Sequence, residues 1–139
     1  MNDSHARAER TQPESFRGRE LTASLTVLDL EKSLAWYTGV MGFTIDRKHE
    51  REGNLMAVSL KAGAVRLLIT KDTGAKGFDR VKGEGFSLQF TTAQNVDELA
   101  ARIKERGGTL ATEPFDAFGA RAFRIVDPDG FRLVISSER

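Results

Sequence analysis

The chain has 139 residues, a length that suits one compact domain or two small units sharing a core. Its 40% hydrophobic and 29% charged residues are ordinary for a globular protein, and a net charge of +1 gives no reason to expect nucleic-acid or membrane partners. The absence of cysteine excludes disulfides, thiolate metal sites and a cysteine nucleophile, and it fits the cytoplasm, where we expect the protein to reside.

The beginning of the chain is polar. Residues 1–19 have no apolar core between their charges, so we expect a flexible arm and not a secretory signal. The arm could also reach across to a partner subunit. No apolar run approaches the ~20 residues that a membrane-spanning helix needs.

The first predicted unit has the order strand, helix, strand, strand, strand. Residues 21–27 alternate, which predicts a strand with one apolar face and one small polar face. Asp29 is a good N-cap for the following helix, whose spacing places Tyr37 in the core, and Gly39 and Gly42 supply its stop signals. Three further strands are predicted at residues 43–49, 55–61 and 64–70.

The second half of the chain repeats this order. A strand is predicted at residues 85–91, and a helix begins at Asn95, with Glu98 placed to complete a capping box. Strands follow at residues 109–112, 121–126 and 131–136. In our alignment of the halves, Ser24-Leu25 matches Ser87-Leu88, and the extra residues of the second half follow that strand. The predicted fold class is therefore α+β: one domain over 20–138, made of two tandem βαβββ units at about 20–72 and 84–138, with a linker at 73–83.

Two stretches carry a resemblance to a known family. LTVLDLEKSLAWYTGVMGF, residues 25–43, and VDPDGFRLVI, residues 126–135, resemble the vicinal oxygen chelate superfamily, which includes glyoxalase I, extradiol dioxygenases and fosfomycin- and bleomycin-resistance proteins. The resemblance covers about residues 21–136. It implies a cup-shaped mixed sheet with helices on its outer face, and a homodimer with the cups at or near its interface. The activity is left open, because this fold hosts several chemistries.

The resemblance also implies where metal ligands would stand. Metal-dependent members place ligands on the first and last strands of each unit, and these positions fall on Thr22, Arg66, Gly85 and Val134, with Phe86 as the alternative to Gly85. Divalent metals take imidazole or carboxylate donors, which none of these residues offers. We therefore expect no metal, no cofactor and no catalytic residue.

The strand alternation predicts which side chains face the inside of the cup. The candidate ligand-binding residues are Thr22, Ser24, Thr26, Arg66, Leu68, Ser87, Gln89, Arg132 and Val134, with Phe118 on a loop near the mouth. They suit a neutral or anionic organic ligand. Arg66 either binds the ligand or forms an intramolecular ion pair. His49 lies in a charged hairpin and is expected to be solvated. Asp127 and Asp129 belong to the turn, and their carboxylates are expected to brace backbone groups and not to act as acids.

The leading interpretation is a metal-independent protein that sequesters a small organic ligand, as bleomycin-resistance proteins do. The alternative is a glyoxalase- or dioxygenase-like enzyme that recruits a metal through Glu20 or Glu84, or that acts without metal on a carbonyl substrate. A third possibility is an accessory subunit that uses the fold as an interaction platform, which predicts a filled cup.

Overall fold

The computed structural model describes residues 15–138, and the greater part of the predicted arm lies outside them. The first unit contains β1 (Ala23–Val27), α2 (Leu30–Ala35), which continues into the π-helical turn η1 (Trp36–Val40), and the strands β2 (Thr44–Arg51), β3 (Asn54–Ala62) and β4 (Val65–Lys71). As predicted, Asp29 caps α2: its carboxylate accepts a hydrogen bond of 3.1 Å from the Lys32 amide.

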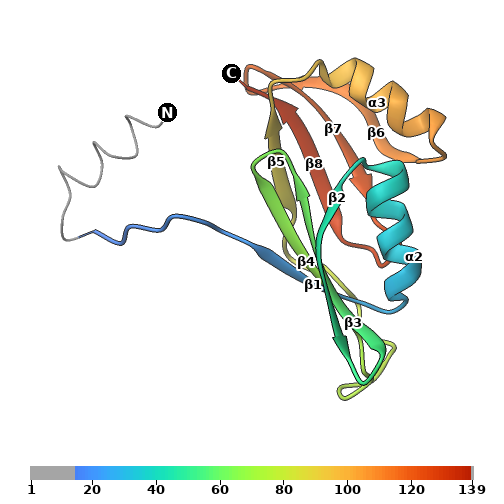
Figure 1. The fold of residues 1–139 in the computed structure, drawn as a ribbon. Coiled ribbons are helices and arrows are strands. Elements are labelled where there is room, and N and C mark those ends of the chain that lie inside the picture. Colours follow the sequence, from blue (N-terminus) through green and yellow to red (C-terminus); the bar gives the residue numbers. More distant parts are fainter. Residues whose placement is uncertain (1–14, 139) are drawn as a thin grey trace.

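The second unit repeats these elements (Figure 1). It contains β5 (Leu88–Thr92), α3 (Val96–Glu105), β6 (Leu110–Ala117), β7 (Ala120–Val126) and β8 (Arg132–Ser137). The Asn95 side chain caps α3 by accepting a hydrogen bond of 2.9 Å from the Glu98 amide. β6 is longer than predicted, because a register shift between Thr112 and Phe115 interrupts the alternation on which the prediction relied.

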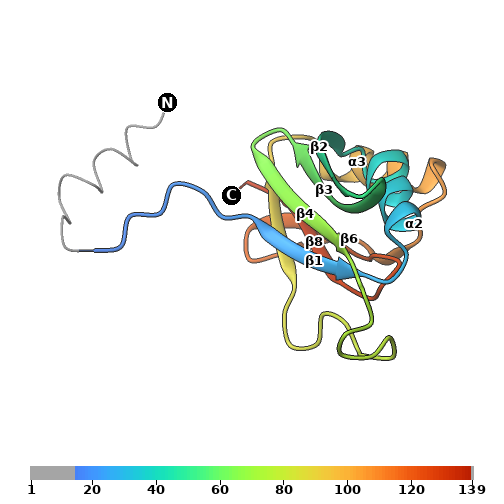
Figure 2. The same ribbon diagram turned by 60° about the horizontal axis from the view of Figure 1, so that its bottom comes forward.

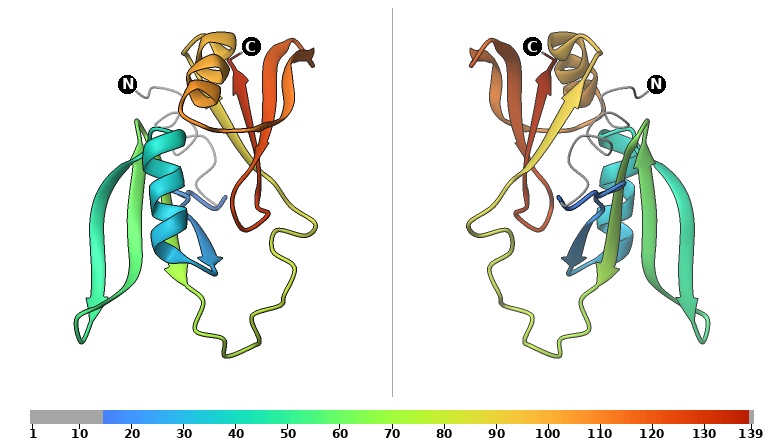
Figure 3. Two further views of the ribbon diagram at one scale, coloured as in Figure 1. Left: turned by 90° about the vertical axis from the view of Figure 1, so that its right-hand side faces the viewer. Right: turned by 90° about the vertical axis from the view of Figure 1, so that its left-hand side faces the viewer.

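Each unit forms its own four-stranded mixed sheet, which confirms the α+β class and the two βαβββ units. The strand orders are β1-β4-β3-β2 and β5-β8-β7-β6, with the first strand of each unit parallel to the last. Figure 3 shows the two units side by side, joined by the long loop between β4 and β5. α2 and α3 lie on the same side of the molecule (Figure 2).

The register of the two parallel ladders corrects the alignment of the halves. The ladder between β1 and β4 and the ladder between β5 and β8 have the same number of residue pairs. The second pair is Ser24 with Leu68 in the first ladder and Gln89 with Val134 in the second. Ser24 therefore corresponds to Gln89 and not to Ser87. The insertion in the second half precedes β5, where the alignment had placed it after the strand.

One hydrophobic core joins both units. It contains alternate residues of the sheets, such as Leu25, Ile69 and Leu133, together with Tyr37 and Ile103 from the helices. The rings of Phe43 and Phe90 meet edge to face across the seam between the units, with centroids 6.1 Å apart. The opposite face of each sheet is left outside this core.

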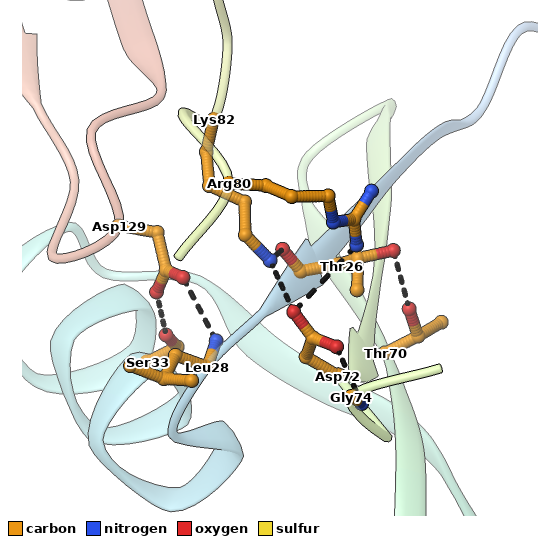
Figure 4. Close-up of polar contacts among 9 residues, drawn as sticks. All are labelled: Thr26, Leu28, Ser33, Thr70, Asp72, Gly74, Arg80, Lys82 and Asp129. Atoms are coloured by element: carbon orange, nitrogen blue, oxygen red, sulfur yellow. Dashed lines mark hydrogen bonds and ion pairs between the residues drawn. The ribbon is translucent and has the colours of Figure 1, made fainter. Parts of the chain in front are cut away.

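The turn between β7 and β8 ties the second unit to the first. The buried Asp127 carboxylate accepts a hydrogen bond of 2.7 Å from the Tyr37 hydroxyl, as well as bonds from the amides of Asp129 and Phe131. Asp129 accepts bonds from the Leu28 amide at 2.8 Å and from the Ser33 hydroxyl at 3.4 Å (Figure 4). The Asp127 carboxylate binds backbone amides of its own turn, as predicted, whereas the Asp129 carboxylate binds the Leu28 amide of the first unit. Both aspartates therefore join the two units.

The loop between the units is held by a second polar cluster. The Lys82 amine donates to the Asp72 carboxylate and to the Thr26 carbonyl, each at 2.9 Å, and Arg80 approaches Asp72 at 3.6 Å (Figure 4). The hydrogen bond from Lys82 holds the pKa of Asp72 below its ordinary value. Lys82 thereby attaches the loop to the end of β1.

Candidate ligand-binding site

A pocket of about 780 Å³ lies on the open face of the second sheet. Its floor consists of side chains that alternate with the core residues of β5, β7 and β8. They are Gln89, Thr91, Ala122, Arg124, Val126, Arg132, Val134 and Ser136, joined by Ser87 just before β5. All residues that line this pocket belong to the second unit.

The register brings a polar amide, an apolar group and a cation into one row of the pocket floor. Val134 pairs with Gln89 on one side and with Arg124 on the other. The Gln89 amide donates a hydrogen bond of 2.8 Å to the Ser87 hydroxyl. The Arg124 guanidinium lies 5.0 Å from the ring centroid of Phe115, a cation–π distance that fixes its position above the sheet.

The pocket contains two arginines that are available to a ligand. Within residues 15–138, neither Arg124 nor Arg132 has a carboxylate within ion-pair distance, whereas Arg121 is engaged by Asp97 at 3.0 Å. Arg66, on the other sheet, donates to Asp46 at 2.9 Å and lies 3.9 Å from Glu20. The intramolecular ion pair considered for Arg66 is therefore present, and the positive charge open to an anion lies on the second sheet.

Phe118 stands at the mouth of the pocket. It is 89% exposed, and its φ of 52° is in the left-handed region, which a bulky side chain rarely adopts. Phe118 and Gly119 form a tight hairpin turn between β6 and β7, where the sequence had indicated a flexible loop. An exposed aromatic ring on strained backbone at a pocket is a candidate functional feature.

The other five predicted residues are on the open face of the first sheet. Ser24, Thr26, Arg66 and Leu68 share that face by strand alternation, and Thr22 comes just before β1. None of the five lines the pocket of the second sheet. The Thr26 and Thr70 hydroxyls are 3.3 Å apart, and Thr22 donates to Glu20 at 2.9 Å. One chain therefore presents the predicted residues on two open faces.

Among the pocket residues that sequence reasoning missed are Arg124 and Phe115, and it also missed one polar pair. Arg124 alternates with the buried Phe123 and Ile125, so the same alternation rule could have found it. Phe115 follows the register shift in β6 and could not be found in this way. His49 is exposed, as expected, but it lies 3.2 Å from the Ser59 hydroxyl.

The structure also corrects the predicted metal-ligand positions. Leu68 corresponds to Val134 in the two ladders, so the ligand position that was expected at Arg66 falls on Leu68. Ser24 corresponds to Gln89, so the counterpart of Thr22 is Ser87. The ligand position that was expected at Gly85 therefore falls on Ser87. The corrected set still contains no imidazole or carboxylate, so these side chains do not fit a divalent cation. Nor do residues 15–138 contain a group of three or more His, Asp or Glu side chains that could hold a metal ion.

The geometry agrees with comparisons to known proteins. The chain is 26% identical over 123 residues to lactoylglutathione lyase of Salmonella typhimurium (83% of this chain, 89% of that protein), and 29% identical over 124 residues to a probable lactoylglutathione lyase of Vibrio cholerae (83% and 87%). The solved structure of TnmS3, an antibiotic binding protein from Streptomyces sp. CB03234, has a TM-score of 0.70 at 20% identity and covers 90% of this chain and 100% of its own.

TioX from Micromonospora sp. ML1 has the same fold, with a TM-score of 0.69 at 18% identity over 88% of this chain and 100% of its own. In the part of the chain that the structure describes, no helix is long and apolar enough to cross a membrane. The model of the Glyoxalase/Bleomycin resistance protein/Dioxygenase superfamily matches residues 21–135. The chain belongs to this superfamily.

Proposed function

We propose that the protein binds a small organic anion on the open face of its second sheet and sequesters it without making or breaking a bond. The observation that carries this proposal is the pair of arginines, Arg124 and Arg132, on the floor of a pocket of about 780 Å³. Arginine recognises carboxylate and phosphate groups through paired hydrogen bonds. The antibiotic-binding neighbour TnmS3 supports the same kind of role.

The remaining walls suit an organic ligand body. Val134, Val126 and Ala122 offer apolar contact, Phe118 offers a ring for stacking, and Gln89 offers an amide. The four positions that carry metal ligands in metal-dependent members lack such donors here, so the proposed capture depends on shape and charge.

In this proposal a homodimer completes the site. The open face of the first sheet carries Thr22, Ser24, Thr26, Arg66 and Leu68. β1 and β5 are edge strands, with one side unpaired by the strands of their own sheets. A second copy that places its first sheet over the pocket would bring the ten predicted residues together. Light scattering after gel filtration tests this, and a monomer at micromolar concentration would overturn the dimer.

The binding site is tested by a thermal-shift screen of organic anions, with Arg132→Met and Arg124→Met beside the wild type. At a hundredfold excess over the dissociation constant, a ligand stabilises the fold by about 2.7 kcal/mol, which such a screen detects readily. Removing one charge-assisted hydrogen bond costs about 1.5–3 kcal/mol, roughly tenfold or more in affinity. Arg51→Met is the matched control, because Arg51 is exposed at the end of β2, outside the pocket and outside the residues of the first sheet that a second copy would bring to it. Hits that bind both pocket variants normally would overturn the proposal.

The lactoylglutathione lyase relatives favour a second candidate, an enzyme of the glyoxalase kind. Glu20, which was considered as a metal ligand, instead accepts a hydrogen bond from Thr22 and lies near Arg66, and both reduce its capacity to bind a cation. Glu84 is exposed in the loop before β5. An assay with methylglyoxal and glutathione in the presence of Ni²⁺ or Zn²⁺ distinguishes the candidates, since metal-dependent turnover would support the enzyme and overturn simple capture.

A further inference from the structure

The two units meet along a seam whose halves are related by the internal repeat. In one half, the β7–β8 turn packs against the start of α2, where Asp129 binds Leu28 and Ser33. In the other half, the β3–β4 turn and the residues around the start of α3 line a common groove. Equivalent elements of the two units therefore meet twice. They are joined by hydrogen bonds in the first half of the seam and are separated by a groove in the second half.

The ladder register shows why the second half is open. In the first unit Ser59 pairs with Leu68, and in the second unit Arg124 pairs with Val134, so Ser59 and Arg124 occupy equivalent positions. Three residues after each of them stand Ala62 and Asp127. Ala62 is therefore the counterpart of Asp127. The hydroxyl partner of Asp127 also has no counterpart. Tyr37 and Ile103 follow their helix caps, Asp29 and Asn95, by the same number of residues, so Ile103 stands where the first unit has Tyr37. An acid and its donor in one half are replaced by two apolar side chains in the other.

This replacement leaves a groove of about 720 Å³ between the units. Its apolar lining includes Met41, Phe43, Ala62, Val65, Phe90 and Leu99, and its cations are Arg102 and Arg106. Arg102 lies in the last turn of α3, and Arg106 is the C-cap residue four positions later, so both are at the same end of the helix. The groove thus has an apolar body beside a site of positive charge.

Both arginines are available. Across residues 15–138, neither Arg102 nor Arg106 has a carboxylate within ion-pair distance, although Lys104 between them is paired with Glu113 at 2.9 Å. The Arg106 guanidinium lies against Gly42: its Nη1 would be 3.3 Å from a Cβ at that position. Gly42 has no Cβ, which leaves room for the guanidinium against the wall of the groove.

We propose that this groove is a second binding site, which takes a small amphipathic anion such as a medium-chain carboxylate. The carboxylate meets Arg102 and Arg106, and the chain lies along Phe43, Phe90 and Leu99. The carboxylate of the ligand would thus lie in the half of the seam that has no counterpart of the Asp127 carboxylate. This site uses different arginines from the pocket of the second sheet, so it does not depend on the function proposed there.

The direct test is isothermal titration of sodium decanoate and decylamine into the full-length protein and its Arg102→Met/Arg106→Met variant. Decanoate is expected to bind the wild type at least tenfold more tightly than decylamine, and the double variant is expected to lose at least tenfold in affinity. Arg47→Met/Arg51→Met is the matched control, because both arginines are exposed on β2 outside the groove, and it should bind decanoate as the wild type does. Equal binding of decanoate and decylamine, no binding of decanoate at millimolar concentration, or unchanged binding to the Arg102→Met/Arg106→Met variant would overturn the proposal.

A second variant tests the argument from the repeat. Ala62→Asp restores an acid at the place that Asp127 has in the other unit, and it should pair with the arginines of the groove. Decanoate affinity is then expected to fall at least tenfold, while Ala62→Asn, which has the same size without the charge, should lose less. Circular dichroism confirms that both variants fold. Decanoate affinity of folded Ala62→Asp equal to that of the wild type would overturn the proposal.

Discussion

Tyr37 donates a hydrogen bond of 2.7 Å to Asp127 across the seam between the two units, and both side chains are buried. Burial raises the pKa of the Asp127 carboxyl, while the bond from Tyr37 favours its ionised form. Burial beside this carboxylate raises the pKa of the Tyr37 hydroxyl as well, so the phenol remains a donor.

Tyr37→Phe is expected to lower the free energy of unfolding by about 1–3 kcal/mol, because it leaves a buried carboxylate without one of its donors. Chemical denaturation measures this loss. A double-mutant cycle with Asp127→Asn isolates the pair, and additive losses would show that the hydrogen bond does not couple the units.

Gly108→Ala is expected to destabilise the fold by about 1–3 kcal/mol through overpacking. A Cβ at this position would lie 2.6 Å from a methyl of Ile103 and 2.8 Å from one of Val40. Gly39→Ala is the matched control: no atom lies within 4 Å of its added methyl, and it is expected to stabilise the helical segment by about 0.5–1 kcal/mol. Thermal unfolding of the two variants should therefore shift in opposite directions, and equal shifts would contradict this account of the packing.

Asp72→Asn is expected to destabilise the protein at pH 7 and to have less effect at pH 3. The hydrogen bond from Lys82 lowers the pKa of Asp72 below its ordinary value of 3.8, so the folded state favours the ionised carboxylate. The resulting stability is present above that ordinary value and is lost as the pH falls through the lowered pKa of the folded state. Denaturant midpoints at the two pH values measure the change, and a difference between wild type and variant that does not shrink in acid would refute it.

Phe118→Asn is expected to raise stability and weaken ligand binding. Asparagine tolerates the positive φ that Phe118 adopts, so the substitution should relieve strain of about 1 kcal/mol. The same change removes the exposed ring at the mouth of the pocket. Melting temperature and ligand affinity are measured on one preparation, and a fall in both would show that Phe118 serves stability.

The order of elements could be predicted from the sequence because both units have clear alternation, capping residues and glycine stops. Thr22, Ser24 and Thr26 were assigned to one face for this reason, and the structure places Ser24 and Thr26 opposite the buried Leu25 and Val27. Periodicity does not report where an insertion lies, so the correspondence of Ser24 with Gln89 required the ladder register.

The candidate site was predictable only in part. The outward faces of β5 and β8 were found by alternation, and they carry Gln89, Arg132 and Val134. Whether an arginine is free depends on residues distant in sequence: Asp46 binds Arg66 from another strand, whereas Arg132 has no such neighbour among residues 15–138. The contacts between the two units could not be predicted from any local pattern, because Asp127 and Tyr37 are distant in sequence and meet only in the folded chain.

The hydrogen bond between the Leu28 amide and the Asp129 carboxylate joins two residues that are 101 positions apart in the sequence. During synthesis, the first unit therefore cannot complete the contacts at the start of α2 until the last hairpin has left the ribosome. Contacts of such long range slow folding, since their loop must close before they stabilise anything. A chain terminated before Asp127 would keep the strands of its first unit but lose the acceptors for Tyr37, Leu28 and Ser33, so truncated products would be readily degraded.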